Sequence, residues 1–171
     1  MYFKIVEQFG PESGDSWNEY LEWRKISFER FDSVDSMMRP DLFEPKTSKD
    51  WDNCVNEDYR LNLLTSLDFA KASAREHSNY EIVGVEIELE NSPSEVEGLL
   101  GFDIIDSYCA TSLLTNWGID DLGFINEKLG NNGLISNFSD AKALRDRLRS
   151  EFWEDSHAHE CSVWAIYRTT T

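Results

Sequence analysis

The stretch of the chain from Glu76 to Glu127 contains 52 residues with no lysine or arginine and with 12 carboxylates. Like charges at this density repel one another, and the repulsion costs stability unless something offsets it. The resulting field also repels phosphate groups and attracts cationic surfaces. The stretch therefore limits the partners that the chain can have, although it identifies no reaction.

Residues 83–90 of this stretch alternate between apolar and acidic side chains after Gly84. Successive side chains of a strand point to opposite faces, and same-face neighbours lie roughly 6.6 Å apart. We therefore predict a strand over residues 80–89, in which Glu86, Glu88 and Glu90 form a row on the wet face. The alternative is an ordinary solvated face, or a charged edge strand that resists aggregation.

Composition indicates a folded domain rather than a disordered chain. The 171 residues suit one domain, and 40% of them are apolar and 13% aromatic, whereas disordered segments are poor in such residues. The net charge of −17 exceeds the magnitude of about 2–8 that suffices for solubility. A salt-rich cytosol would be another explanation for this excess.

Apolar periodicity predicts more strands than helices. The expected strands cover residues 2–9, 25–31, 80–89, 99–105 and 161–167, and the expected helices 16–23, 59–77, 120–129 and 139–152. These elements do not alternate as βαβ units. We therefore expect an α+β fold with a mostly antiparallel sheet of five or six strands, on which two or three helices pack, in a single domain over residues 1–171. Residues 32–58 read as a long loop, and such loops are often functional.

The first residues, the lack of a long apolar run and the cysteines predict a cytoplasmic protein. The first eight residues lack the basic and apolar regions of a signal peptide, and no apolar run approaches the roughly 18 residues that span a bilayer. Cys54, Cys109 and Cys161 are widely spaced, so they predict neither a disulfide framework nor a zinc knuckle.

The segment from His157 to Cys161 is rich in metal-ligand atoms. On a strand, His157, His159 and Cys161 would share a face and could begin a zinc site. A distant fourth ligand would be needed, and the candidates are His77, Cys54 and Cys109. Polar residues are also expected where a helix gives way to a strand, so we predict a structural role, with no metal and no cofactor. The acidic surroundings argue against a Cys–His nucleophile, because they raise the pKa of a thiol.

Signals for phosphate or nucleic-acid binding are weak. Gly98–Gly101 and Gly130–Gly133 are turn signals, and neither is followed by Lys and Ser or Thr. Lys142, Arg145 and Arg149 form a basic stripe on the late helix, which is too small for a nucleic-acid footprint. We expect this stripe to pair with the protein's own carboxylates.

In size, charge and texture the chain resembles the bacterial immunity proteins of toxin–immunity pairs. The resemblance is carried by the acidic stretch 76–127 and by the closing helix 139–152 and strand 163–167. It implies a binding protein without enzymatic activity that neutralises a basic protein, such as a nuclease-type toxin, with neither nucleic acid nor a membrane as partner. The candidate partner-binding residues are Glu86, Glu88, Glu90, Glu95, Glu97, Asp103, Asp106, Tyr108, Trp117, Asp120 and Asp121. Two alternatives remain: a small metal-dependent hydrolase that uses clustered carboxylates, and an acidic subunit of a larger assembly.

Overall fold

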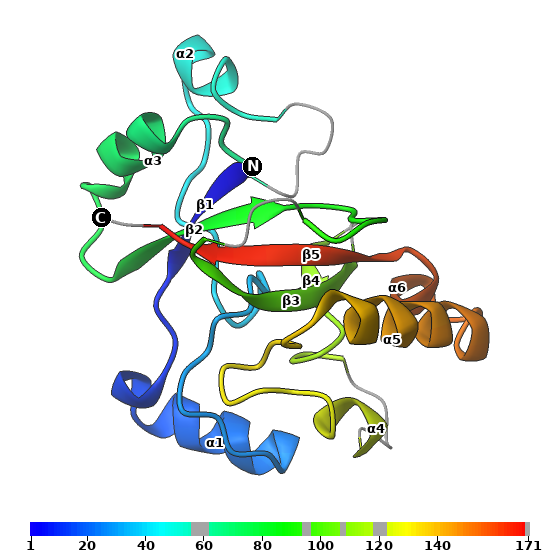
Figure 1. Ribbon diagram of the computed structural model, residues 1–171. Coiled ribbons are helices and arrows are strands. Elements are labelled where there is room, and N and C mark those ends of the chain that lie inside the picture. Colours follow the sequence, from blue (N-terminus) through cyan, green and yellow to red (C-terminus); the bar gives the residue numbers. More distant parts are fainter. Residues whose placement is uncertain (56–61, 94–96, 107–108, 118–122, 170–171) are drawn as a thin grey trace.

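The computed structural model describes residues 1–55, 62–93, 97–106, 109–117 and 123–169. Its central element is an antiparallel sheet (Figure 1). Its strands are β1 (Tyr2–Glu7), β2 (Tyr80–Glu86), β3 (Leu99–Asp106), β4 (Thr111–Ser112) and β5 (Cys161–Arg168). The order across the sheet is β1-β2-β5-β3-β4. The last strand of the chain therefore lies at the centre, between β2 and β3.

Helices occupy the connections between strands. They are α1 (Asp15–Arg24), α2 (Ser48–Trp51), α3 (Leu67–Ala74), α4 (Gly123–Asn126), α5 (Phe138–Glu151) and α6 (Ser156–His159), with the 3-10 turn η1 (Pro11–Ser13) before α1. The predicted α+β class with a five-stranded antiparallel sheet is confirmed. Within the described ranges, no helix is both long and apolar enough to cross a membrane.

The register of the strands assigns each side chain to one of two faces. Directly paired residues share a face, so Ile5, Ile82 and Phe102 lie on one side, with α3 against β1 and β2 and α5 against β3 and β5. We call this side the helix face. The opposite side, the loop face, carries Val83 and Trp164.

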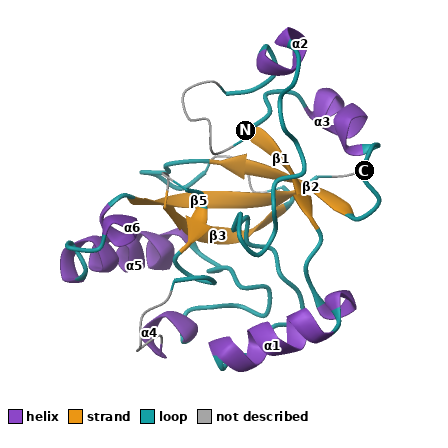
Figure 2. Cartoon of the chain, turned by 180° about the vertical axis from the view of Figure 1, so that it is seen from behind, coloured by secondary structure: helices purple, strands orange, loops and turns teal. Residues whose placement is uncertain are grey.

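Irregular segments cover the loop face. Val34, Leu63 and Leu134, from three different connections, pack there against the strands. Figure 2, seen from behind, shows these long connections crossing the sheet. Because both faces are covered, β5 is buried from Cys161 to Tyr167. A strand that is buried on both sides reads as a continuous apolar run.

The predicted strand over residues 25–31 is wrong. This segment is irregular, and its Glu29 and Arg30 amides donate to the Asn131 carbonyl rather than to a neighbouring strand. Phe28 and Phe31 are buried against α1. The two residues are three positions apart, so on an extended strand their rings would point to opposite faces, and they meet one surface only because the chain is not extended.

Several predicted boundaries also shift. Of the helix expected over residues 59–77, residues 59–61 lie outside the described ranges, and the described part is helical only in α3, because the Ser66 side chain caps it and Leu64 forms a bridge to Phe3 instead. The late helix α5 is capped by Asn137 rather than by Ser139. The strand expected over residues 80–89 ends as β2 at Glu86, since Glu88 has a left-handed backbone with φ 55°.

Candidate functional site

The early end of β2 separates the three glutamates that were predicted to form one row. Glu86 is half-buried at the last position of β2, whereas Glu88 and Glu90 are exposed in the turn that follows. Leu89 still donates its amide to the Val163 carbonyl at 2.8 Å, which holds this turn beside β5. Glu97 is exposed just before β3.

Two of these glutamates meet residues from the end of the chain. A recess of about 380 Å³ is lined by Glu88, Glu90, Arg149, Glu160 and Ser162, and we call it the acidic recess. Its one guanidinium is engaged within the protein, since Arg149 Nε donates to the Cys161 carbonyl at 2.8 Å. Three carboxylates therefore surround a cation that is already hydrogen-bonded.

Two residues of the basic stripe on α5, Lys142 and Arg145, pair with the protein's own carboxylates as predicted, whereas Arg149 donates to the Cys161 carbonyl. Arg145 contacts Glu90 at 2.9 Å and Asp146 at 2.8 Å, and Lys142 lies 3.8 Å from Glu90. The hydrogen bond from Arg145 holds the pKa of Glu90 below its usual value. Among the described residues, no lysine or arginine pairs with Glu88 or Glu160.

The prediction that Asp103 contacts a partner is wrong for this conformation. Asp103 is fully buried on the loop face, where Ser33 Oγ donates to it at 2.5 Å and Ser112 Oγ at 2.6 Å. The Ile104 amide donates to the same carboxylate at 2.8 Å. Burial raises the pKa of Asp103 to about 6.

Asp35 extends this buried network. Its carboxylate accepts hydrogen bonds from the Ser112 amide at 2.7 Å and from the amides of Met37 and Met38, so it fixes the turn after residue 35 against β4. Burial raises the pKa of Asp35 as well. We call Ser33, Asp35, Asp103 and Ser112 the buried network. Its hydrogen bonds join three distant parts of the chain, which indicates a structural role.

Asp106, at the end of β3, is 2% exposed and lies on the helix face. It was predicted to contact a partner at the surface, and its burial contradicts this prediction as well. Its Oδ2 is 2.5 Å from His157 Nδ1 and 2.9 Å from Cys109 Sγ. Cys109 Sγ is also 3.7 Å from the same His157 nitrogen. We call these three residues the Asp–Cys–His cluster.

The cluster is held by short-range structure. The Ala110 amide donates to the Asp106 carbonyl at 2.9 Å, which keeps Cys109 near the end of β3. Asp155 caps the first turn of α6 and so positions His157. The imidazole presents the same nitrogen to Asp106 and to Cys109, so it cannot relay a proton from the thiol to the carboxylate. Burial and the hydrogen bond to Asp106 raise the pKa of the Cys109 thiol.

The zinc arrangement considered from the sequence does not form. His157 and His159 lie on α6 rather than on a strand, and His159 turns to Glu160, with Nδ1 3.0 Å from Oε1. Cys161 is buried in the core beneath α5, and burial raises its thiol pKa to about 11. Of the candidate distant ligands, Cys109 is the residue that meets His157.

The remaining predicted site residues are core residues or lie outside the described ranges. Trp117 is 5% exposed and packs edge-on against Phe152, with ring centroids 5.0 Å apart, so it is not an interface anchor. The residues outside the described ranges are Glu95, Tyr108, Asp120 and Asp121.

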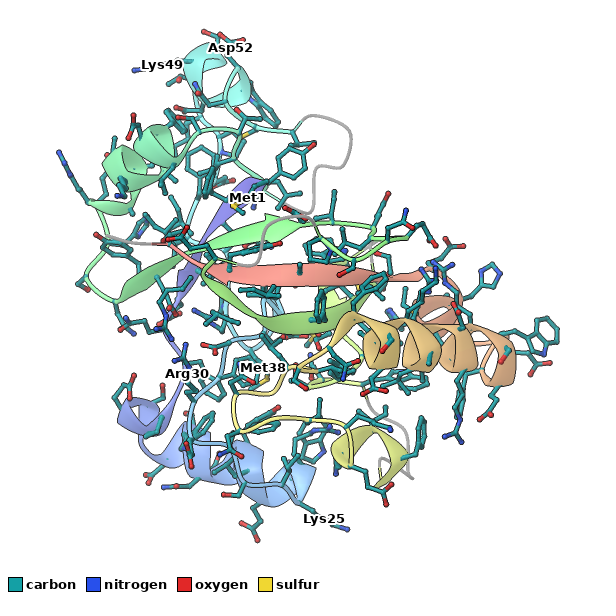
Figure 3. The ribbon with its side chains drawn as sticks, in the orientation of Figure 1. Met1, Lys25, Arg30, Met38, Lys49 and Asp52 are labelled. Carbon is teal, nitrogen blue, oxygen red and sulfur yellow. The ribbon has the colours of Figure 1, made fainter. Side chains whose placement is uncertain are left out.

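Carboxylates also line recesses elsewhere on the molecule. A recess of about 520 Å³ beside α2 has four carboxylates and one lysine, Lys46. Another of about 310 Å³ beside η1 has four carboxylates and one arginine, Arg30. The exposed lysines Lys25 and Lys49 stand at opposite ends of the molecule (Figure 3). The negative charge is therefore not confined to the stretch 76–127.

Sequence reasoning missed Glu160 as a member of the acidic recess and missed the whole buried network. No local pattern links Ser33 to Asp103, which is 70 residues away. Trp153, 64% exposed between α5 and α6, was also missed, and its only signal is an aromatic residue within an acidic run. No protein-family model, curated protein or solved structure matches this chain.

Proposed function

We propose that this protein is a cytoplasmic binding protein that neutralises a basic protein partner, in the manner of the immunity proteins that block nuclease-type toxins. The observation that carries the proposal is the acidic recess, where three carboxylates surround one arginine. The three carboxylates outnumber the single guanidinium of Arg149, so the recess keeps an excess of negative charge.

Glu88 and Glu160, the members of the acidic recess without a lysine or arginine partner among the described residues, are the natural contacts for a partner's lysines and arginines. Glu88 and Glu160 are exposed, and within the described part of the chain neither has a lysine or arginine partner. Glu90 is neutralised by α5 and instead holds the turn in place. Complementary charge raises association rates, and close charge pairs at an interface couple by roughly 1.5–7 kcal/mol.

An exposed aromatic residue offers apolar contact close in sequence to this charge. Trp153 is 64% exposed between α5, which carries Arg149, and α6, which is followed by Glu160. Tryptophan is enriched among the residues that dominate binding energy at interfaces. We therefore place Trp153 in the partner-binding surface, in the position that the sequence assigned to Trp117.

The test is capture from a lysate of the source organism at low salt, with elution by rising salt. The variant Glu88→Lys/Glu160→Lys reverses the charge of two exposed acids of the recess. The matched control Glu19→Lys/Glu22→Lys makes the same change in net charge on the exposed side of α1. We expect the first variant to recover at least about tenfold less of a basic protein than the wild type, and the control to lose no more than about threefold.

Equal losses in the two double variants would show that net charge alone drives capture, and would contradict a role for the acidic recess. Recovery of no basic protein by the wild type would contradict the proposed function itself.

A further inference from the structure

The Asp–Cys–His cluster gathers three different metal-ligand atoms that the proposed function does not use. Asp106 Oδ2, Cys109 Sγ and His157 Nδ1 all lie within 4.8 Å of one another. They come from the end of β3, from the turn before β4 and from α6. We propose that this cluster is a binding site for a borderline divalent cation of the zinc type, with three protein ligands and one position left for water.

The combination of donors favours zinc-type cations over magnesium or calcium. Thiolate and imidazole are ligands of Zn²⁺ and related transition metals, whereas Mg²⁺ and Ca²⁺ prefer oxygen ligands only. The exposed carboxylates elsewhere on the molecule offer oxygen alone, so they do not share this preference. The cluster is therefore chemically distinct from the acidic background of a chain with net charge −17.

One donor separation, between Cys109 Sγ and His157 Nδ1, is close to that of a tetrahedral site, and the two separations from Asp106 Oδ2, of 2.5 and 2.9 Å, are shorter. Zn–S bonds of about 2.3 Å and Zn–N or Zn–O bonds of about 2.0–2.1 Å place a sulfur and a nitrogen ligand about 3.5 Å apart and an oxygen and a nitrogen ligand about 3.3 Å apart. Cys109 Sγ and His157 Nδ1 are 3.7 Å apart. Asp106 Oδ2 and His157 Nδ1 are 2.5 Å apart, so a cation between them requires a separation larger by about 0.8 Å.

The histidine is the ligand with room to move. Its side chain is 48% exposed, on a helix of four residues, while the Asp106 side chain is 2% exposed at the end of β3. A rotation of the imidazole toward solvent opens the site without disturbing the sheet. The same exposure supplies an entry path for the cation and leaves a coordination position for water.

The groups around Cys109 favour its role as a thiolate ligand. Thr111 Oγ1 lies 3.2 Å from Cys109 Sγ, within reach to stabilise a thiolate. In the metal-free protein the Cys109 thiol donates to Asp106, and a cation would replace that shared proton. Hydrogen bonds to metal ligands from surrounding residues commonly raise affinity by fixing the ligands in place.

The experiment uses the full chain, stripped of metal and kept in excess Mg²⁺ so that exposed carboxylates are occupied. Co²⁺ is then titrated, because a cobalt–thiolate bond produces a charge-transfer absorption that oxygen ligands do not. We expect one Co²⁺ per chain with this band, and displacement of the band by one equivalent of Zn²⁺.

Matched variants locate the site. Cys109→Ser should abolish the band and Cys54→Ser should keep it. His157→Gln should weaken Co²⁺ binding by more than about tenfold, because removing a ligand lowers metal affinity more than removing a group that only supports a ligand. His159→Gln should leave binding unchanged. Circular dichroism of the metal-free variants checks that each one folds.

Absence of the charge-transfer band in the wild type would overturn the proposal, as would a band that persists in Cys109→Ser. Metal binding that Mg²⁺ suppresses completely would also overturn it, because the ions would then belong to the surface carboxylates. No partner protein is needed, so this result is independent of the proposed function.

Discussion

Asp103 and Asp106 lie three residues apart on one strand, yet they serve two different environments. Asp103 faces the loop side, where it is fully buried and accepts hydrogen bonds from Ser33 and Ser112. Asp106 faces the helix side, beside a histidine whose side chain is 48% exposed. The comparison teaches that the face of the strand, rather than the residue type, separates a structural carboxylate from one that a ligand can reach.

The two environments also differ in whether the protein alone supplies the partners of the carboxylate. The buried network satisfies Asp103 with donors from the protein itself, so nothing has to be added. The Asp–Cys–His cluster brings three donor atoms together beside solvent, and it is completed, in our proposal, by a cation that enters once the imidazole moves away from Asp106. Because Asp103 and Asp106 lie on opposite faces, they cannot hold one ion together, and the clustered-carboxylate hydrolase suggested by the sequence lacks this pair.

The largest expected effect comes from removing the donors of the buried network. Ser33→Ala/Ser112→Ala leaves the Asp103 carboxylate with the Ile104 amide alone of the three donors described for it. Hydrogen bonds to charged groups contribute about 1.5–3 kcal/mol each, so the free energy of unfolding at neutral pH should fall by about 4 kcal/mol. Urea denaturation measures this loss, and a loss below about 1 kcal/mol would show that the network is not structural.

A second effect concerns pH. The pKa of Asp103 is raised to about 6 in the folded state, against about 3.9 unfolded. Between these values the folded state binds the extra proton, so this group's contribution to stability increases as pH falls from 7 toward 4. Asp103→Asn should remove that contribution, and the difference between variant and wild type should change by about 2 kcal/mol between pH 7 and 4.5.

The measurement is urea denaturation of both proteins across this pH range. Comparing the two cancels the contributions of titrating groups that do not interact with Asp103. One such group is Glu90, whose pKa is lowered by Arg145 and whose contribution to stability is therefore lost on acidification. Asp35 interacts with Asp103, so its contribution changes together with that of Asp103. A difference that stays constant with pH would contradict the burial of a titrating Asp103.

The half-exposed cluster should tolerate substitution. In the metal-free protein, Cys109→Ser and His157→Gln each change partly exposed side chains, so the free energy of unfolding should shift by no more than about 1 kcal/mol. Thermal unfolding with and without Zn²⁺ gives the contrast: the wild type should be stabilised by the ion, and the two variants much less. Equal stabilisation of all three would place the ion elsewhere.

The smallest expected effect on stability belongs to the acidic recess. Glu88→Lys/Glu160→Lys changes exposed side chains that pair with no lysine or arginine among the described residues, so the free energy of unfolding should change by no more than about 0.5 kcal/mol. Chemical denaturation checks this value. A large loss would mean that these acids are structural, and reduced partner capture would then report misfolding.

The sequence predicts the fold class well because strands β1, β2, β3 and β5 each carry clear apolar patterns. The parity of Asp103 and Asp106 already places them on opposite faces. It does not reveal that residues 32–35 cover one face, since that segment has no periodicity and its contact with Asp103 spans 70 residues. The acidic stretch therefore suggested that Asp103 is exposed, whereas its carboxylate is buried and accepts hydrogen bonds from the hydroxyl groups of Ser33 and Ser112.

The candidate site shows the same limit. Glu88 and Glu90 were predicted from alternation, and they do line the acidic recess. The recess also needs Glu160, which lies in a different part of the chain and which only the pairing of β5 with β2 brings close. Likewise, Cys109 meets His157 only because Asp106 pairs with Cys161 across β3 and β5.

The most direct test of the central claim, that the acidic recess attracts a cationic protein, is the association rate of the captured partner as a function of ionic strength. For the wild type, we expect the rate constant to fall at least about tenfold as salt rises from low to physiological concentration and above. For Glu88→Lys/Glu160→Lys, the rate should start lower and depend less on salt. A wild-type association rate that does not change with salt, or that the double variant reproduces, would contradict the account.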